Sequence, residues 1–336
     1  MLELTTLREL LAYPRHIVIT THHKPDGDAI GSSLGLYNYL IQKGHHVKVI
    51  TPTDYPVFLQ WLPNNPEVII YTEKREESES LVSEADLIFC LDFNSLSRIN
   101  ELGIKVGESK AKKIMIDHHL EPEDFDDFRY WSINACATAQ LVYEFISKVM
   151  EEPALINKDV ATCLYTGIMT DSGSFRFSTT TPTVHHIAAD LISRGAENSK
   201  IHELVYDNFS ENRLRFIGYC LLNKLEVLSE YHTALITVGK EELAKFNITT
   251  GDTEGLVNYA LSIIGIKLGV LIIERSELVK LSLRSTGNFP ANEICKKHFN
   301  GGGHRNAAGG QSAQSLEETI ARFKQILPEY KSLLIQ

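Results

Sequence analysis

Residues 16–51 have the sequence HIVITTHHKPDGDAIGSSLGLYNYLIQKGHHVKVIT, and this stretch decides the fold class. Its first residues, His16–Thr20, are mostly β-branched and apolar, which predicts a buried strand. A loop rich in turn-forming residues follows, then a helical pattern from about Gly31 to Lys43, and then a second strand over His46–Thr51. The order strand–helix–strand is that of a βαβ unit and implies a parallel sheet.

The same alternation continues through the first half of the chain. Leu87–Leu91 and Lys113–Ile116 are apolar runs that predict two further strands, and the charge-rich segment Glu73–Glu84 predicts a solvated helix. The next part is mostly helical in pattern, with helices expected over residues 135–150, 159–169, 182–194 and 197–228. The last of these is long and amphipathic, and could bridge two domains.

The final hundred residues change character. Strands are expected at His232–Val238, Leu268–Glu274 and Val279–Ser285, and helices at Thr253–Tyr259 and Ala291–His298. We therefore expect an α/β protein of two domains. Residues 1–190 would form the parallel-sheet domain, residues 191–230 a helical linker, and residues 231–336 a smaller α/β domain.

Composition narrows the function classes. The 336 residues include 33 basic and 43 acidic side chains without a Lys/Arg run, which argues against long duplex nucleic acid bound on a broad positive stripe. The formal charge of −10 leaves an anionic substrate open, because bound divalent cations reverse the local sign. The five scattered cysteines predict buried free thiols. Without a signal-peptide core or an 18-residue apolar run, we expect a cytoplasmic protein that does not span a membrane.

Side chains that can bind metal ions follow several apolar runs. His22, Asp26 and Asp28 follow the first strand, Asp92 follows Leu87–Leu91, Asp117, His118 and His119 end the strand at Lys113–Ile116, and Asp171 follows the helical run Cys163–Met169. In an open parallel sheet, ligands gather at the carboxyl ends of the strands. The first three groups should therefore converge, and Asp171 joins them if its helix ends over the same edge.

The residue types indicate which ions would bind. A set of carboxylates and imidazoles without thiolates favours manganese or magnesium, with zinc, cobalt or iron possible. Six or seven ligands suit two ions about 3.5–4 Å apart that share a carboxylate. Taken singly, Asp92 and Asp171 could be turn or cap residues, residues 25–28 a tight turn, and His118-His119 two surface histidines. The coincidence of all four groups favours the metal site.

A glycine-rich segment near the end of the chain is a second candidate site. Gly301-Gly302-Gly303-His304 precedes the small residues Ala307–Gly310, which we expect to form a helix whose start presents backbone N–H groups to an anion. His304 adds a cationic or hydrogen-bonding group, and Arg284 near a strand end suits a phosphate or carboxylate. Three glycines alone are more often a flexible loop.

Together these motifs resemble the DHH phosphoesterase family, in the branch whose second domain is the DHH-associated domain with a Gly-Gly-Gly-His motif. The resemblance covers essentially the whole chain. The motifs occur in the order His22-His23-Lys24-Pro25-Asp26-Gly27-Asp28, Asp92, Asp117-His118-His119, Thr170-Asp171-Ser172-Gly173 and Gly301–His304.

The resemblance implies a role for each motif residue. One ion, most often manganese and otherwise magnesium or cobalt, would be held by His22, Asp26 and Asp92, and a second by Asp28, Asp92, His118 and Asp171. The catalytic group would consist of Asp92 as the bridge, Asp117 as the residue that orients His118, and His119 facing the scissile phosphate. Substrate would also contact Arg284, Gly302, Gly303 and His304.

The compact two-domain form is similar to the bacterial nano-RNase and pAp-phosphatase group. This implies hydrolysis of short RNA and dinucleotides such as pApA, and dephosphorylation of 3′-phosphoadenosine 5′-phosphate (pAp) to AMP. Two alternatives remain at this point: a phosphodiesterase acting on cyclic di-AMP or linear dinucleotides, and a catalytically weak nucleotide-binding regulator. A homodimer is compatible with the resemblance.

Overall fold

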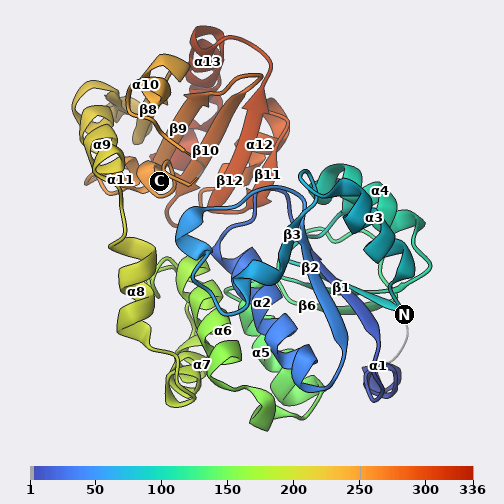
Figure 1. Cartoon of the computed structure of the whole chain (residues 1–336). Coiled ribbons are helices and arrows are strands. Elements are labelled where there is room, and N and C mark those ends of the chain that lie inside the picture. Colours follow the sequence, from blue (N-terminus) through green and yellow to red (C-terminus); the bar gives the residue numbers. More distant parts are fainter. Residues whose placement is uncertain (1–3, 250, 336) are drawn as a thin grey trace. The chain divides into compact units, whose positions relative to one another are not determined.

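The computed structural model describes residues 4–249 and 251–335 (Figure 1). The chain divides into two compact units, unit 1 up to Asn208 and unit 2 from Phe209. In the described part of the chain, no helix is both long and apolar enough to cross a membrane.

Unit 1 is built on a six-stranded sheet in which every strand pair is parallel. The strands are β1 (His16–Thr21), β2 (His46–Thr51), β3 (Val68–Ile70), β4 (Leu87–Leu91), β5 (Lys112–Asp117) and β6 (Phe128–Trp131), in the order β3-β2-β1-β4-β5-β6. The expected parallel sheet is confirmed. Strand order reverses between β1 and β4, and ligands of open α/β sheets bind at the carboxyl ends of the strands at such a switch point.

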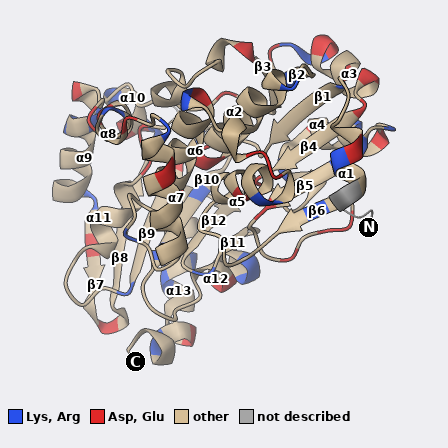
Figure 2. Ribbon diagram, turned by 90° about the horizontal axis from the view of Figure 1, so that it is seen from below, with Lys and Arg blue, Asp and Glu red and all other residues tan. Residues whose placement is uncertain are grey.

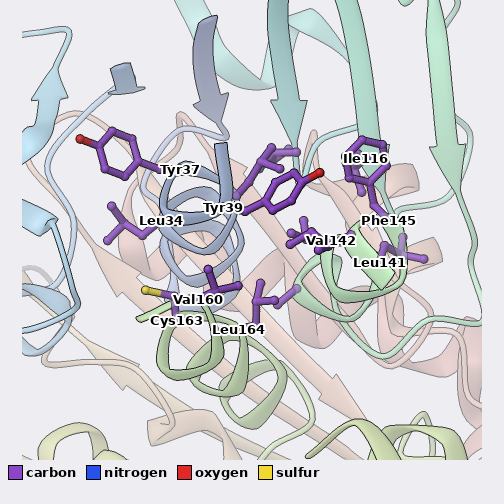
Figure 3. Close-up of a cluster of buried hydrophobic side chains, with 14 of the residues drawn as sticks. Leu34, Tyr37, Tyr39, Ile116, Leu141, Val142, Phe145, Val160, Cys163 and Leu164 are labelled. Carbon is purple, nitrogen blue, oxygen red and sulfur yellow. The ribbon is translucent and has the colours of Figure 1, made fainter. Parts of the chain in front are cut away.

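Helices cover both faces of this sheet. They are α1 (Leu4–Leu10), α2 (Gly27–Gln42), α3 (Arg75–Glu84), α4 (Asn100–Glu108), α5 (Thr138–Glu144), α6 (Lys158–Asp171), α7 (Pro182–Ser193) and α8 (Asn198–Tyr206). Side chains of α2, α5 and α6 share one buried core with one sheet face, and α3 and α4 pack on the other. Figure 3 shows part of the first core, which includes Tyr39 of α2, Leu164 of α6 and Phe145, the residue that follows α5.

Helix α2 begins earlier than the sequence pattern indicated. It starts at Gly27 rather than near Gly31, because the Asp26 carboxylate caps it. Asp26 Oδ1 accepts hydrogen bonds from the backbone N–H groups of Asp28 (3.0 Å) and Ala29 (3.1 Å). Asp28 therefore lies in the first helical turn, in a fixed position beside the end of β1.

Three glycines at every fourth position allow α2 and α6 to approach closely. A Cβ atom added to Gly31 would lie 2.7 Å from the carbonyl oxygen of Cys163 and 2.8 Å from the backbone nitrogen of Gly167. Gly27 and Gly35 are equally close to side chains of α6. This contact positions the carboxyl end of α6, and hence Asp171, near the amino end of α2.

Unit 2 contains a second six-stranded sheet, which is mixed. Its strands are β7 (Leu225–Leu228), β8 (Thr233–Val238), β9 (Leu268–Glu274), β10 (Val279–Ser285), β11 (Gly302–His304) and β12 (Ala307–Ser312), in the order β11-β12-β10-β9-β8-β7. Only β8 and β9 pair in parallel. One face packs on α12 (Ala291–His298) and α13 (Leu316–Leu334), the other on α9 (Glu211–Asn223), α10 (Lys240–Lys245) and α11 (Leu256–Leu261).

The expected helix over residues 197–228 is wrong. The segment forms α8, α9 and β7, with a break at residues 207–210. Ser210 starts α9 anew, since its hydroxyl oxygen accepts the backbone N–H of Arg213 at 3.1 Å. Leu225–Leu228 then pairs with β8 instead of extending the helix.

The helix expected at Ala307–Gly310 is also wrong, because these residues belong to strand β12. Their backbone groups pair with β10 on one side and β11 on the other. Gly301 permits this pairing, since a Cβ there would lie 2.0 Å from the carbonyl oxygen of Gly309. The glycine segment therefore presents a strand edge, and not a helix start, to its surroundings.

Candidate metal centre

The side chains expected to bind metal ions all lie at the carboxyl edge of the unit 1 sheet. His22 follows β1, Asp92 follows β4, Asp117 ends β5, and His118 and His119 come next. Asp28 lies in the first turn of α2, and Asp171 is the last residue of α6. The structure therefore brings together all four groups that the sequence analysis singled out.

One cluster consists of His22, Asp26 and Asp92. His22 Nε2 lies 3.5 Å from Asp92 Oδ2 and 3.9 Å from Asp26 Oδ1. One ligand atom from each of these residues lies within 4.8 Å of the others. The Asp26 side chain is 50% exposed, so this cluster is open on one side.

A second cluster consists of Asp28, Asp92 and His118, with Asp171 beside it. His118 Nε2 lies 3.5 Å from Asp92 Oδ1, 3.9 Å from Asp28 Oδ2 and 3.5 Å from Asp171 Oδ2. Asp92 thus faces the first cluster with one carboxylate oxygen and the second with the other. This is the placement that a shared carboxylate between two ions requires.

Hydrogen bonds from the start of α5 fix the carboxylates of Asp28 and Asp92. The N–H groups of Thr138 and Ala139, at the start of α5, donate to Asp28 at 2.6 and 2.9 Å. The Thr138 hydroxyl donates to Asp92 Oδ1 at 2.9 Å. The carboxylates are therefore held in place by the fold itself.

Backbone carbonyls orient the two histidines of these clusters. His22 Nδ1 lies 3.0 Å from the carbonyl oxygen of His23, and His118 Nδ1 lies 3.2 Å from that of Ala135. With Nδ1 directed at a carbonyl oxygen, Nε2 of each ring is the nitrogen that faces the carboxylates. Nε2 is therefore the atom that would bind a metal ion once its proton is released.

Asp117 contacts His119 rather than the expected His118. The fully buried Asp117 accepts the backbone N–H of His119 at 3.2 Å, and its Oδ1 lies 2.8 Å from His119 Nδ1. Asp117 therefore orients His119, whereas the carbonyl oxygen of Ala135 orients His118.

The buried carboxylates of Asp28 and Asp92 bring together negative charge that bound cations would stabilise. Burial, followed by the charges of Asp92 and Asp171, raises the pKa of Asp28 well above its usual range. Burial acts in the same direction on Asp92, but hydrogen bonds with His118 and His22 hold the pKa of Asp92 well below its usual range. Within residues 4–249 and 251–335, Asp28, Asp92 and Asp117 form ion pairs only with histidines. Converging oxygen and imidazole ligands fit divalent cations.

Arg98 is a candidate functional residue that the sequence analysis missed. It lies in the turn η3 (Leu96–Ile99) that follows β4, and its carbonyl oxygen accepts the backbone N–H of His23 at 2.8 Å. Burial is the largest cause that lowers the pKa of His119. The hydrogen bond with Asp117 raises this pKa, and the positive charge of Arg98 lowers it. Arg98 is partly buried, and its charge acts on both His22 and His119, which places its side chain near the cluster. The signal in the sequence was an arginine six residues after Asp92 in the same strand-end loop.

Unit 2 places its own candidate residues together. Arg284 of β10 and His304 of β11 both pair with Ala307 of the intervening strand β12. Residues directly paired across strands point to the same face of a sheet. Arg284 and His304 therefore flank a small side chain on one face, and Gly302 and Gly303 precede His304 on β11.

Comparisons with known proteins agree with this arrangement. A family model described as the DHH family, N-terminal domain, matches residues 16–168, and one for the DHHA1 domain matches residues 231–330. A Thermus thermophilus protein named "Bifunctional oligoribonuclease and PAP phosphatase NrnA" is 34% identical over 87% of this chain and 83% of its own length. The chain belongs to the DHH phosphoesterase family.

Two further proteins show how far the similarity to this DHH phosphoesterase extends. The Bacillus subtilis protein of the same name as the Thermus relative is 27% identical over 94% of this chain and 96% of its own length. A crystal structure of an "exopolyphosphatase-related protein" from Bacteroides fragilis is 42% identical with a TM-score of 0.94, and the match covers 99% of this chain and 97% of that one. The DHH phosphoesterase fold therefore extends over both units.

Proposed function

We propose that this DHH phosphoesterase hydrolyses very short oligoribonucleotides and dinucleotides such as pApA to mononucleotides, and pAp to AMP. The two relatives with 34% and 27% identity are named as oligoribonucleases and PAP phosphatases, which supports short oligoribonucleotides and pAp as substrates. The observation that carries the proposed chemistry is Asp92, whose two carboxylate oxygens face two separate clusters of ligands. One carboxylate between two clusters suits a two-metal phosphoesterase.

The ligand chemistry supports a particular division of the site. His22, Asp26 and Asp92 would hold one divalent ion, and Asp28, Asp92, His118 and Asp171 the other, with manganese favoured over magnesium or cobalt. Such ions, when bound, supply a water that is deprotonated near neutral pH and a positive charge that stabilises the phosphoryl oxygens.

The chain's own residues would orient the substrate around that centre. Asp117 fixes the ring of His119 through Nδ1, which leaves Nε2 to contact the scissile phosphate or its departing oxygen. Arg98 is partly buried, and its guanidinium offers a fork of donors that matches phosphate oxygens. In unit 2, Arg284, Gly302, Gly303 and His304 would bind the substrate's other phosphate or nucleoside.

A substrate panel tests this proposal. Hydrolysis of pAp, pApA, cyclic di-AMP, short RNA oligomers and pyrophosphate is measured with manganese and with magnesium. We expect the highest kcat/KM for pApA and pAp. A clear preference for cyclic di-AMP or pyrophosphate, or nucleotide binding without turnover, would contradict the proposal.

Two variants at opposite ends of β4 test the role of the carboxylate between the two clusters. Asp92→Ala should reduce turnover on the order of 10³-fold or more, because it removes a ligand from both clusters. Asp86→Ala is the matched control, since Asp86 is an exposed residue directly before β4 whose side chain accepts the backbone N–H of His16 at 2.8 Å. Near wild-type turnover by Asp92→Ala would refute the two-metal assignment.

A further inference from the structure

Trp131 is an exposed aromatic residue at the edge of the candidate metal centre. It ends the edge strand β6, and its residue is 37% exposed. Its indole N–H donates a hydrogen bond of 2.7 Å to the carbonyl oxygen of His119. The polar atom of the side chain is thus satisfied, while part of its apolar surface stays in contact with water.

The strand register fixes where this ring lies. Trp131 pairs with Asp117 across the parallel strands β5 and β6. Paired residues point to the same face of the sheet, so Trp131 lies beside the carboxylate that holds His119. The ring therefore lies beside His119, the residue proposed to face a phosphate.

Within the part of the chain that the structure describes, the exposed part of the Trp131 ring has no aromatic partner. In the described segments 4–249 and 251–335, no aromatic ring stacks against Trp131. The next large apolar side chain, Ile133, is also exposed, at 47%. Ligand sites are lined largely by apolar and aromatic side chains around a few polar groups, so an exposed ring beside this polar cluster is suited to contact a ligand.

We propose that Trp131 is the stacking platform for the base of the nucleotide that carries the scissile phosphate. This inference rests on the proposed function and extends it to base recognition within unit 1. In a nucleotide, the base and the phosphate are attached to the same ribose and therefore lie close together. Trp131 and His119, the residue that would face the phosphate, are also adjacent, because a hydrogen bond links them. The hydrogen bond also fixes the ring before binding, so little conformational freedom is lost when a base stacks on it.

Stacking on Trp131 would make the protein prefer nucleotides to inorganic phosphates. Stacking on an aromatic ring is tolerant of base identity, because every base has a flat face. Trp131 would therefore favour substrates with a base over pyrophosphate or polyphosphate, without choosing strongly among the bases.

The tryptophan content of the chain allows a direct binding measurement. The chain has two tryptophans, Trp61 and Trp131, so Trp61→Phe leaves Trp131 as the single reporter. The magnesium-loaded variant is titrated with AMP and, as the matched ligand without a base, with ribose 5-phosphate. We expect AMP to quench or shift the Trp131 emission, and ribose 5-phosphate to leave it unchanged at saturation. Equal responses to the two ligands would overturn the stacking role.

Substitutions of Trp131 test whether the ring or its hydrogen bond matters. Trp131→Ala should weaken AMP binding on the order of tenfold and leave ribose 5-phosphate binding unchanged. Trp131→Phe keeps a ring but lacks the N–H group, and should retain most of the AMP affinity. Tyr13→Ala, which removes an aromatic residue that is 70% exposed, is the control and should change neither.

The outcomes also separate this inference from the proposed function. If Trp131→Phe binds AMP as weakly as Trp131→Ala, or if both ligands weaken together, Trp131 acts only by supporting His119 and the inference fails. If wild-type protein hydrolyses pyrophosphate but no nucleotide, the proposed function fails, and the fluorescence response to AMP still decides the inference.

Discussion

Replacing Gly31 by alanine tests whether the contact between α2 and α6 sets the geometry of the acidic cluster. The added Cβ would lie 2.7 Å from the Cys163 carbonyl oxygen and 2.8 Å from the Gly167 nitrogen, both of which are backbone atoms. Ordinary contact begins near 3.4 Å, so the helices must separate by about 0.7 Å (3.4 − 2.7). Asp28 lies one turn from Gly31, and Asp171 one turn from Gly167, so this movement separates two of the expected ligands.

The expected loss of stability follows from two opposing effects. Overpacking a well-packed core costs ~1–3 kcal/mol, and the upper end applies because backbone atoms cannot move aside. Replacing glycine by alanine inside a helix stabilises it by ~1 kcal/mol. The net loss is therefore about 2 kcal/mol, which lowers the urea midpoint by roughly 1 M at an m-value of ~2 kcal/mol/M. Because positions of supporting residues matter to bound ions, we also expect roughly tenfold weaker manganese binding.

Fluorescence-detected urea unfolding measures this loss in unit 1 alone, because both tryptophans, Trp61 and Trp131, lie in that unit. Gly107→Ala is the matched control. Gly107 lies in helix α4 of the same unit, and its added Cβ would approach only the flexible tip of Leu96, at 3.3 Å. A midpoint of Gly31→Ala equal to or above that of the wild type would refute the reasoning about this contact.

Three further outcomes follow from the structure. Arg98→Ala should raise KM for pApA on the order of tenfold, with partial recovery in Arg98→Lys, and an unchanged KM would remove Arg98 from the substrate site. His304→Ala should raise KM far more than it lowers kcat, and a selective loss of kcat in steady-state assays would instead place His304 in the chemical step. All five cysteines are buried and free, and burial raises the pKa of Cys220 and Cys295 to about 12. A thiol reagent such as DTNB should therefore react with the folded protein slowly and with five thiols after denaturation, and rapid labelling of the native protein would contradict this burial.

The buried His/Asp clusters were predictable because their residues follow apolar runs. His22, Asp92 and Asp117 lie at the ends of β1, β4 and β5, and a buried parallel strand leaves a strong local signal in the sequence. The carboxyl ends of parallel strands meet at one edge whatever the lengths of the connections. The convergence of these residues therefore needed no knowledge of distant contacts.

Other features depend on contacts that no local pattern contains. Ala307–Gly310 has few side chains to create periodicity, and its strand conformation comes from pairing with β10 and β11. The break before Ser210 interrupts an amphipathic pattern that is otherwise continuous, and depends on one cap. Trp131 gained significance only through the register of an edge strand against Asp117. Local sequence patterns thus predicted most helices and strands, whereas strand pairing and helix capping determined the features that these patterns missed.

The backbone at Asp92 shows how the fold sustains the shared carboxylate. Asp92 has φ of +64°, a left-handed conformation that costs ~1–2 kcal/mol for a residue other than glycine, although aspartate tolerates it better than most. Its N–H donates to the Ile116 carbonyl at 3.1 Å, and Thr138 donates to its side chain, so neighbouring segments hold the residue in this conformation. The turn of the chain at the end of β4 brings one oxygen to His22 and the other to His118. A turn or cap residue would need no contacts on both sides, so the placement of Asp92 between His22 and His118 supports its proposed role as a carboxylate shared between two cations.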